Sequence, residues 1–268
     1  MNLNKLLKIS HDTAELALHH YKFCLCGLVF LSFIFKLLLY WLEPSIGRDA
    51  SLYCHLAQEW SYSGEFNHVW LPPLLIFLMK CGTAIGISVQ TAGQAINIIA
   101  ASLCTLIGYG ITSEVTESKR TALIAAALFA VHPGINDLSI EIQRDAPYLF
   151  LAGTAMWSAV AGLKRKNFLF WIISGIFCAL AALTRFETFE FLPIAAGLLF
   201  VAAISRQISW KQACLYIFVF YAFTAVTFCV SIWGMGTTQV FDRYSNYFTD
   251  KLIFAQKQFF QPQNGDRK

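Results

Sequence analysis

The longest polar passage of this sequence, Ser45 to Leu75, holds the first side chains that could do chemistry. Arg48 and Asp49 stand side by side in it. Tyr53 follows Asp49 at i+4, so on a helix Asp49 and Tyr53 would point the same way. A carboxylate held against a hydroxyl can take its proton, and an arginine fork can bind a phosphate. The alternative interpretation is an ordinary interfacial loop with a solvated acid.

The connector that follows His132 carries a second group of charges, among them Asp137, Glu141, Arg144 and Asp145. Asp137 and Glu141 are four residues apart and are typical of solvated connector charges. Asp145 stands at an expected helix start, where a carboxylate interacts favourably with the helix dipole. Helix capping is therefore an alternative to a chemical role for Asp145.

A third group lies in the short connector LTRFE, which contains Arg185 and Glu187. Arg185 and Arg144 could each bind a phosphate at a membrane face. The alternative for Arg185 is an ion pair with Glu187 or Asp145 that holds two membrane spans together. His68 has no second histidine at metal spacing, and we expect it to form hydrogen bonds rather than to bind a metal.

The composition places these groups in a membrane protein, because 57% of the 268 residues are hydrophobic and only 13% are charged. The net charge of +4 is assigned to membrane orientation, and no nucleic-acid partner is implied. The cysteines fall mostly in apolar runs without CxxC pairs, so we expect small buried side chains. A bridge between Cys54 and Cys81 stays open.

The fold predicted is an all-α, polytopic transmembrane bundle of about seven spans. The first connector forms an amphipathic or re-entrant passage suited to lying on a bilayer surface. The run Leu71 to Met79 is short and follows two prolines; if it does not cross, the basic connectors all share the cytoplasmic side. The predicted spans are 22–42, 94–112, 121–131, 147–163, 168–183, 189–204 and 213–233.

Counted from a cytoplasmic amino terminus, the seven spans place the three groups of charges at one extracytoplasmic face. Polar groups gathered at one face of a helical bundle predict a functional site there. An ordered set of residues in the first connector also resembles the first extracytoplasmic loop of the GT-C glycosyltransferases. That superfamily includes the protein O-mannosyltransferases and the lipid A aminoarabinose transferases. The resemblance covers roughly Ser32 to Ala203, the amino-terminal half of such an enzyme. The residues that carry it are Arg48-Asp49, Tyr53, Ala57, Gly64 and Pro72-Pro73-Leu74.

The resemblance implies transfer of a sugar, with inversion, from a polyprenyl-phosphate donor to a glycan, lipid or protein acceptor outside the cytoplasm. Asp49 would be the catalytic base and Asp145 the second acidic residue. Some relatives bind a divalent metal between such acids, but Ala50 stands where many carry another carboxylate, and no metal site is predicted. Arg185 and Arg144 would bind the donor phosphate, with support from Arg48, Tyr53, Glu187 and His68.

The domain organisation expected is a cytoplasmic segment (1–21), a GT-C-like membrane domain (22–233, with its first outer loop at 43–93) and an outer tail (234–268). The location implied is the inner, or plasma, membrane. Complete GT-C enzymes continue through more spans, so a second chain could supply the remaining half. The alternative function is a non-catalytic membrane subunit or a truncated scaffold. A transporter is a weaker alternative, since the sequence shows no internal repeat.

Overall fold

The computed structural model describes residues 20–42, 47–66 and 71–239 together with Tyr244, Thr249 and Ile253, and of Arg48 only the backbone. Within these ranges the regular structure is entirely helical, which confirms the all-α prediction. Most of the predicted end segments 1–21 and 234–268, as well as His68, lie outside the described residues. The elements are α2 (Tyr21–Leu42), α3 (Arg48–Ser63), α4 (Leu74–Ala84), α5 (Val89–Thr116), α6 (Lys119–Val131), α7 (Pro133–Ile140), α8 (Asp145–Arg165), α9 (Phe168–Ala182), η1 (Phe186–Glu190), α10 (Phe191–Ile204) and α11 (Trp210–Met235).

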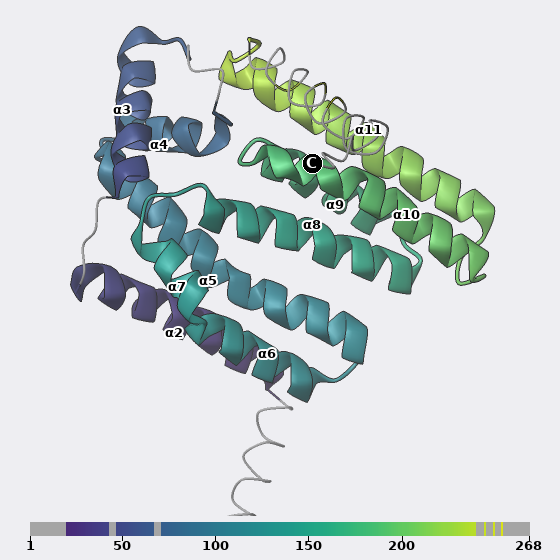
Figure 1. The fold of residues 1–268 in the computed structure, drawn as a ribbon. Coiled ribbons are helices and arrows are strands. Elements are labelled where there is room, and N and C mark those ends of the chain that lie inside the picture. Colours follow the sequence, from purple (N-terminus) through teal and green to yellow (C-terminus); the bar gives the residue numbers. More distant parts are fainter. Residues whose placement is uncertain are drawn as a thin grey trace, which may run out of the picture.

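The long helices lie side by side as a bundle, and α3 stands across one of its ends with α4 packed beneath it (Figure 1). This end also receives the carboxy-terminal ends of α2, α9 and α11 and the amino-terminal ends of α5 and α8. We call it the α3 end. The connectors α5–α6, α8–α9 and α10–α11 lie at the opposite end, which we call the basic end.

Five described helices are long and apolar enough to cross a membrane: α2, α5, α8, η1 with α10, and α11. The pair α6 and α7, bent by 45°, would make a sixth span. The seventh predicted span corresponds to α9, whose 15 residues extend about 22 Å, short of a hydrocarbon core of about 30 Å. The run after the two prolines forms α4, whose 11 residues extend about 16 Å, about half of that thickness.

Small residues let α9 pack closely between its neighbours despite its shortness. An added Cβ at Gly175 of α9 would lie 2.6 Å from the Phe220 carbonyl oxygen of α11, so the two backbones touch where only glycine fits. Trp171 is fully buried nearby and stacks on Tyr216 of α11 with ring centroids 6.0 Å apart. Close backbone contact with α11 thus stabilises α9 in the bundle although the helix is short.

The break between α6 and α7 falls at Pro133, which cannot donate a backbone hydrogen bond. Lys36 of α2 is fully buried next to it. Its ammonium group donates to the Ser32 hydroxyl at 2.7 Å and to the Ala130 carbonyl at 3.3 Å. A charged side chain from α2 therefore stabilises the free carbonyl end of α6.

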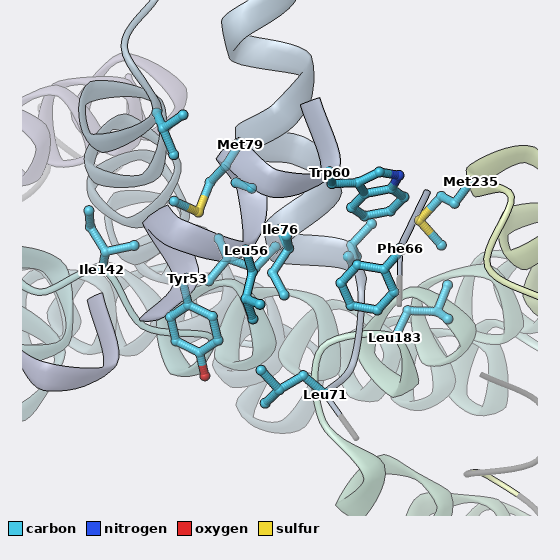
Figure 2. Packing of buried hydrophobic residues seen from close by; sticks show 14 of the residues in the cluster. Tyr53, Leu56, Trp60, Phe66, Leu71, Ile76, Met79, Ile142, Leu183 and Met235 are labelled. Carbon is cyan, nitrogen blue, oxygen red and sulfur yellow. The ribbon is translucent and has the colours of Figure 1, made fainter. Parts of the chain in front are cut away.

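The apolar stripe of α3 faces protein. The stripe consists of Leu52, Leu56 and Trp60. Leu56 and Trp60, with Tyr53 beside them, are buried in the largest hydrophobic cluster, against Ile76 and Met79 of α4 (Figure 2), and Leu52 is partly buried against the same cluster. The prediction that this amphipathic helix lies on the bilayer surface is therefore wrong for its apolar face, because α4 covers that face.

The cysteines are all free, so the bridge left open between Cys54 and Cys81 is not formed. Cys104 and Cys178 are buried as expected, whereas Cys81 and others are exposed. Most of the exposed ones lie on helices that could face lipid, where a small apolar side chain needs no protein cover.

Candidate active site

Three connectors and α3 place the predicted site residues together at the α3 end. Asp49 is in the first turn of α3, Asp145 is in the first turn of α8, and Arg185 immediately precedes η1. The backbone N–H of Leu74 donates to the Leu183 carbonyl at 3.0 Å. The turn after the two prolines is thus tied directly to the turn that carries Arg185.

Arg185 is the structural centre of the charged group. Its guanidinium forms an ion pair with the Asp145 carboxylate and a second one with Glu187 at 3.3 Å. Hydrogen bonding to Glu187 is the main cause that raises the pKa of Arg185. The guanidinium also lies over the Tyr148 ring, 5.4 Å from its centroid. The ion pairs that the sequence left open as an alternative are therefore both present.

Asp145 does not cap α8, since the residue at the N-cap position is Arg144 and no side-chain capping hydrogen bond is made there. The predicted helix start at Asp145 is confirmed. Its carboxylate still lies in the first turn, where the helix dipole favours it. The contact that Asp145 makes is with Arg185, which is as exposed as Asp145 itself, at 29% and 28% of the side chain.

Tyr53 connects α3 to this group. Its ring is buried in the hydrophobic cluster, and its hydroxyl points out of the cluster (Figure 2). Burial raises the pKa of Tyr53, while the positive charges of Arg144 and Arg185 act to lower it and the negative charges of Asp49 and Asp145 to raise it. The phenol therefore stays protonated at neutral pH within electrostatic reach of all four predicted groups.

Arg144 differs from Arg185 in its pairing. Its charge acts on Tyr53 and on Glu187, yet within the described ranges it forms no ion pair. Asp49 is exposed on α3, so its carboxylate is accessible to a small hydroxyl compound. The site thus combines an accessible carboxylate, a cation without an ion pair and a cation held by two carboxylates.

Two amides inside α5 hold the connector that carries Arg144 and Asp145. Gln94 donates to the Ser139 carbonyl at 2.7 Å, and Asn97 donates to the Glu141 carbonyl at 2.6 Å. Both amides are buried. Neither amide is among the site residues predicted above; the signal in the sequence is two polar side chains three residues apart in an apolar span.

Of the two connector acids expected to be solvated, Asp137 and Glu141, only Asp137 is exposed to solvent. Asp137 is exposed on α7, as predicted, but Glu141 is half-buried and accepts a hydrogen bond from Gln143. A Cβ added at Gly47 would lie 3.3 Å from the Glu141 carboxylate. Glu141 thus fixes the entrance of α3 against the connector before α8.

A cavity of about 390 Å³ opens beside the charged group, between α8, η1 and α10. Tyr148, Glu187, Thr188 and Glu190 form its polar part. The remaining lining is mostly apolar and extends along both helices to Met156 and Ile194. The arrangement can accept an apolar chain whose polar end reaches the ion pair of Arg185.

The donor set does not favour a metal. Across the described parts of the chain no group of three or more His, Cys, Asp or Glu side chains gathers. Asp145, one of the two ligands considered, is already bound by Arg185. We therefore derive no step through a metal ion.

Comparison with known proteins gives two matches. Residues 71–233 match the family model described as dolichyl-phosphate-mannose-protein mannosyltransferase. The chain is also 25% identical over 166 residues to the undecaprenyl phosphate-alpha-4-amino-4-deoxy-L-arabinose arabinosyl transferase of Pseudomonas aeruginosa (strain UCBPP-PA14). This match covers 56% of the chain and 30% of the relative, so the aligned part spans less than a third of the relative's length.

Proposed function

Because the chain belongs to the dolichyl-phosphate-mannose-protein mannosyltransferase family of GT-C membrane glycosyltransferases, we propose that it transfers a sugar from a polyprenyl-phosphate donor. The observation that carries the proposal is that the charges of Asp49, Arg144 and the Arg185–Asp145 pair all act on the Tyr53 hydroxyl, at an end of the bundle where a mostly apolar cavity opens. The relative's name specifies a pentose on undecaprenyl phosphate. The same kind of donor, a pentosyl or hexosyl polyprenyl phosphate, fits this site.

In the proposed reaction an acceptor hydroxyl attacks the anomeric carbon of the bound sugar. Asp49, which is exposed on α3, takes the hydroxyl proton as the new C–O bond forms. The bond from the anomeric carbon to the phosphate oxygen breaks on the opposite face, which inverts the carbon. The polyprenyl phosphate leaves with the electron pair.

The leaving phosphate needs cations that are not already neutralised. Arg144 meets this need most directly because it has no ion-pair partner among the described residues. Arg185 is held by Asp145 and Glu187, so a phosphate would share its guanidinium or displace a carboxylate. We therefore place Arg144 against the phosphate, with Arg185 positioned beside it by its two carboxylates.

The first isoprene units of the donor would occupy the cavity between α8 and α10. Apolar lining favours an isoprenoid chain, and the cavity ends at Glu187 and Tyr148, next to Arg185. An acceptor glycan, lipid or protein would approach from the exposed side of α3. Segments that correspond to the unaligned part of the longer relative, or a second chain, would complete the acceptor side.

The orientation proposed is the α3 end outside the cytoplasm and the basic end inside. Lys119, Lys164, Arg165, Lys166, Arg206 and Lys211 are all at the basic end. Positively charged connectors stay on the cytoplasmic side during insertion. The inner membrane is the corresponding location.

One observation favours a second function, a membrane subunit without turnover. The guanidinium of Arg185 is bound by two carboxylates, as in a purely structural ion-pair network. In that case the α3 end would hold a partner chain in place rather than bind a donor.

The test is transfer of labelled sugar from a synthetic polyprenyl-phosphate sugar in membranes that contain the protein. Asp49→Asn should lower the rate by at least about 100-fold, because the base is lost while the shape is kept. The matched control is Asp137→Asn, which changes an exposed aspartate at the same end of the bundle. Equal rates for Asp49→Asn and wild type would remove Asp49 as the base. No transfer by the wild type with any donor would favour the subunit.

A further inference from the structure

The basic end contains a second cavity that the proposed reaction does not use. Its volume is about 460 Å³, and it lies between the α8–α9 turn and the α10–α11 turn. Two connectors that are 40 residues apart in the chain therefore form one hollow at the membrane face. Its lining consists of Lys166, Ala203, Arg206, Gln207, Ile208, Ser209, Trp210 and Gln212.

The charge in this cavity is of one sign. Lys166 comes from one turn and Arg206 from the other, and no acidic side chain lines the hollow. Neither cation forms an ion pair with a described residue. The cavity is therefore a concave site with two positive charges that the described part of the protein does not neutralise.

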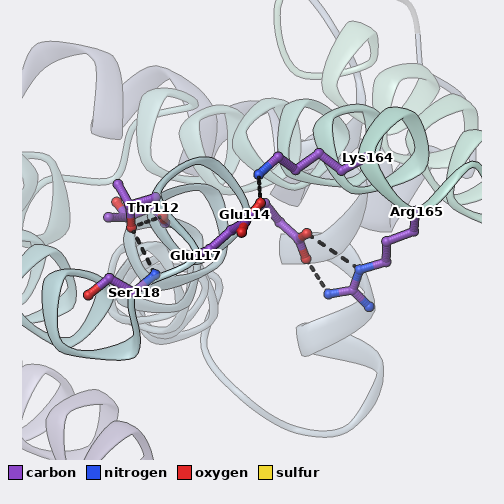
Figure 3. A network of polar contacts seen from close by, with 7 residues as sticks. Thr112, Glu114, Glu117, Ser118, Lys164 and Arg165 are labelled. Atoms are coloured by element: carbon purple, nitrogen blue, oxygen red, sulfur yellow. Dashed lines mark hydrogen bonds and ion pairs between the residues drawn. The ribbon is translucent and has the colours of Figure 1, made fainter. Parts of the chain in front are cut away.

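Neighbouring cations at the same end behave differently, as Figure 3 shows. Lys164 binds the Glu117 carboxylate at 2.7 Å, and Arg165 is paired with Glu114. Lys119 lies over the Tyr21 ring, 4.3 Å from its centroid. Ion pairing and aromatic contact thus satisfy Lys164, Arg165 and Lys119, but neither is seen for Lys166 and Arg206 within the cavity.

Both cations also occupy backbone positions that favour glycine. Lys166 has φ of 52° and Arg206 has φ of 58°, both in the left-handed region that closes a helix. In this region a residue with a Cβ atom is less stable than glycine, because the Cβ crowds the following carbonyl oxygen. Membrane orientation would be satisfied by positive residues anywhere in these connectors. Lys166 and Arg206 instead line one and the same cavity.

The edge of the cavity has the chemistry of a membrane interface. Trp210 is 53% exposed and packs edge-on against Phe200, with centroids 5.5 Å apart. Tryptophan is enriched at the level of lipid headgroups. Gln212 gives only its amide oxygen to the Ser209 cap of α11, so its NH₂ group remains as a donor for the cavity.

We infer that this cavity binds the phosphodiester headgroup of an anionic phospholipid. Lys166 and Arg206 would bind the phosphate, and the acyl chains would leave past Trp210 along the outer faces of α10 and α11. A free phosphate ester shares the same anionic chemistry but lacks the chains that Trp210 would contact. The inference does not depend on the transferase reaction, because the site lies at the opposite end of the bundle.

The experiment measures binding of phosphatidylglycerol to the full chain in detergent by native mass spectrometry, with phosphatidylcholine and glycerol 3-phosphate as comparison probes. The double variant Lys166→Gln/Arg206→Gln should bind phosphatidylglycerol about thirty-fold more weakly than wild type. The matched control Lys164→Gln/Lys211→Gln removes one cation from each of the same connectors, outside the cavity lining, and should change affinity less than about three-fold. The exchange Lys166→Arg/Arg206→Lys should keep most of the affinity.

Three results would overturn the inference. Equal losses in the two glutamine pairs would mean that diffuse positive charge attracts the lipid. Equal affinity for phosphatidylcholine would mean that the headgroup charge is not recognised. Glycerol 3-phosphate that binds as tightly as phosphatidylglycerol would identify a soluble anion as the ligand. Thermal unfolding in the same detergent checks that each variant folds.

Discussion

The guanidinium of Arg185 binds the carboxylate of Asp145 across 40 positions of sequence and so joins the turn before η1 to the first turn of α8. The charges of both residues act on the Tyr53 hydroxyl, which α3 brings from a third part of the chain. The candidate site therefore depends on three segments that only the folded bundle places together.

Arg185→Lys should keep one positive charge but lose the fork that holds two carboxylates. Lysine can bind Asp145 or Glu187, and the other carboxylate would then lack its partner. We expect transfer to fall by about 10-fold or more through a lower kcat, since one charge-assisted hydrogen bond contributes about 1.5 to 3 kcal/mol. Steady-state kinetics with the polyprenyl donor measure it. Unchanged kcat would mean that the fork geometry does not position the donor phosphate.

Tyr53→Phe should test the hydroxyl without disturbing the hydrophobic cluster, because the ring stays in place. We expect the free energy of unfolding to change by less than about 1 kcal/mol and the transfer rate to fall several-fold. Tyr62→Phe is the matched control, since Tyr62 is on the same helix and is 91% exposed. Equal rates in the two variants would contradict a role for the Tyr53 hydroxyl.

The sequence predicted the helical bundle and the face at which the charges gather. Apolar runs and the distribution of Lys and Arg follow from the bilayer itself, so they can be read without a three-dimensional structure. The span at 168–183 was harder, because α9 has only 15 residues and is held by the contact of Gly175 with α11. Such a backbone contact cannot be read from the hydrophobicity of the sequence.

The candidate site was predictable in its residue types but not in its pairing. Arg185 had two possible carboxylate partners in the sequence, and the fold gives it both. Gln94 and Asn97 were not singled out, since their role depends on backbone carbonyls of a distant connector. The sequence of α3 predicts an apolar stripe but does not tell whether α4 or a bilayer covers it.

Glu187→Gln should lower stability in a pH-dependent way. Burial acts to raise the pKa of Glu187, but hydrogen bonds and charge from Arg185 outweigh it, so the pKa lies below its usual 4.5. A carboxyl group with a lowered pKa contributes stability above pH 4.5, and this is lost as the pH falls through the folded-state value. Wild type should therefore have a higher Tm than the variant at pH 7, and the difference should shrink below about pH 4.5.

The measurement is thermal unfolding in detergent from pH 3.5 to 7. Glu65→Gln, a change of an exposed glutamate just after α3, is the control and should follow wild type across the range. A Tm difference for Glu187→Gln that does not change with pH would contradict a contribution from the charged pair with Arg185.

Gly175→Ala should separate α9 from α11. The new Cβ would meet the Phe220 carbonyl oxygen at 2.6 Å and the Thr224 backbone nitrogen at 3.2 Å, and backbone atoms cannot move aside as a flexible side chain can. We expect a loss of about 1 to 3 kcal/mol in the free energy of unfolding. Gly197→Ala in α10 is the matched control, because nothing lies within 4 Å of its added Cβ. Alanine there should stabilise the helix by up to about 1 kcal/mol. Unfolding in detergent should therefore shift in opposite directions for the two variants, and a shift of the same sign in both would contradict the close contact of α9 with α11.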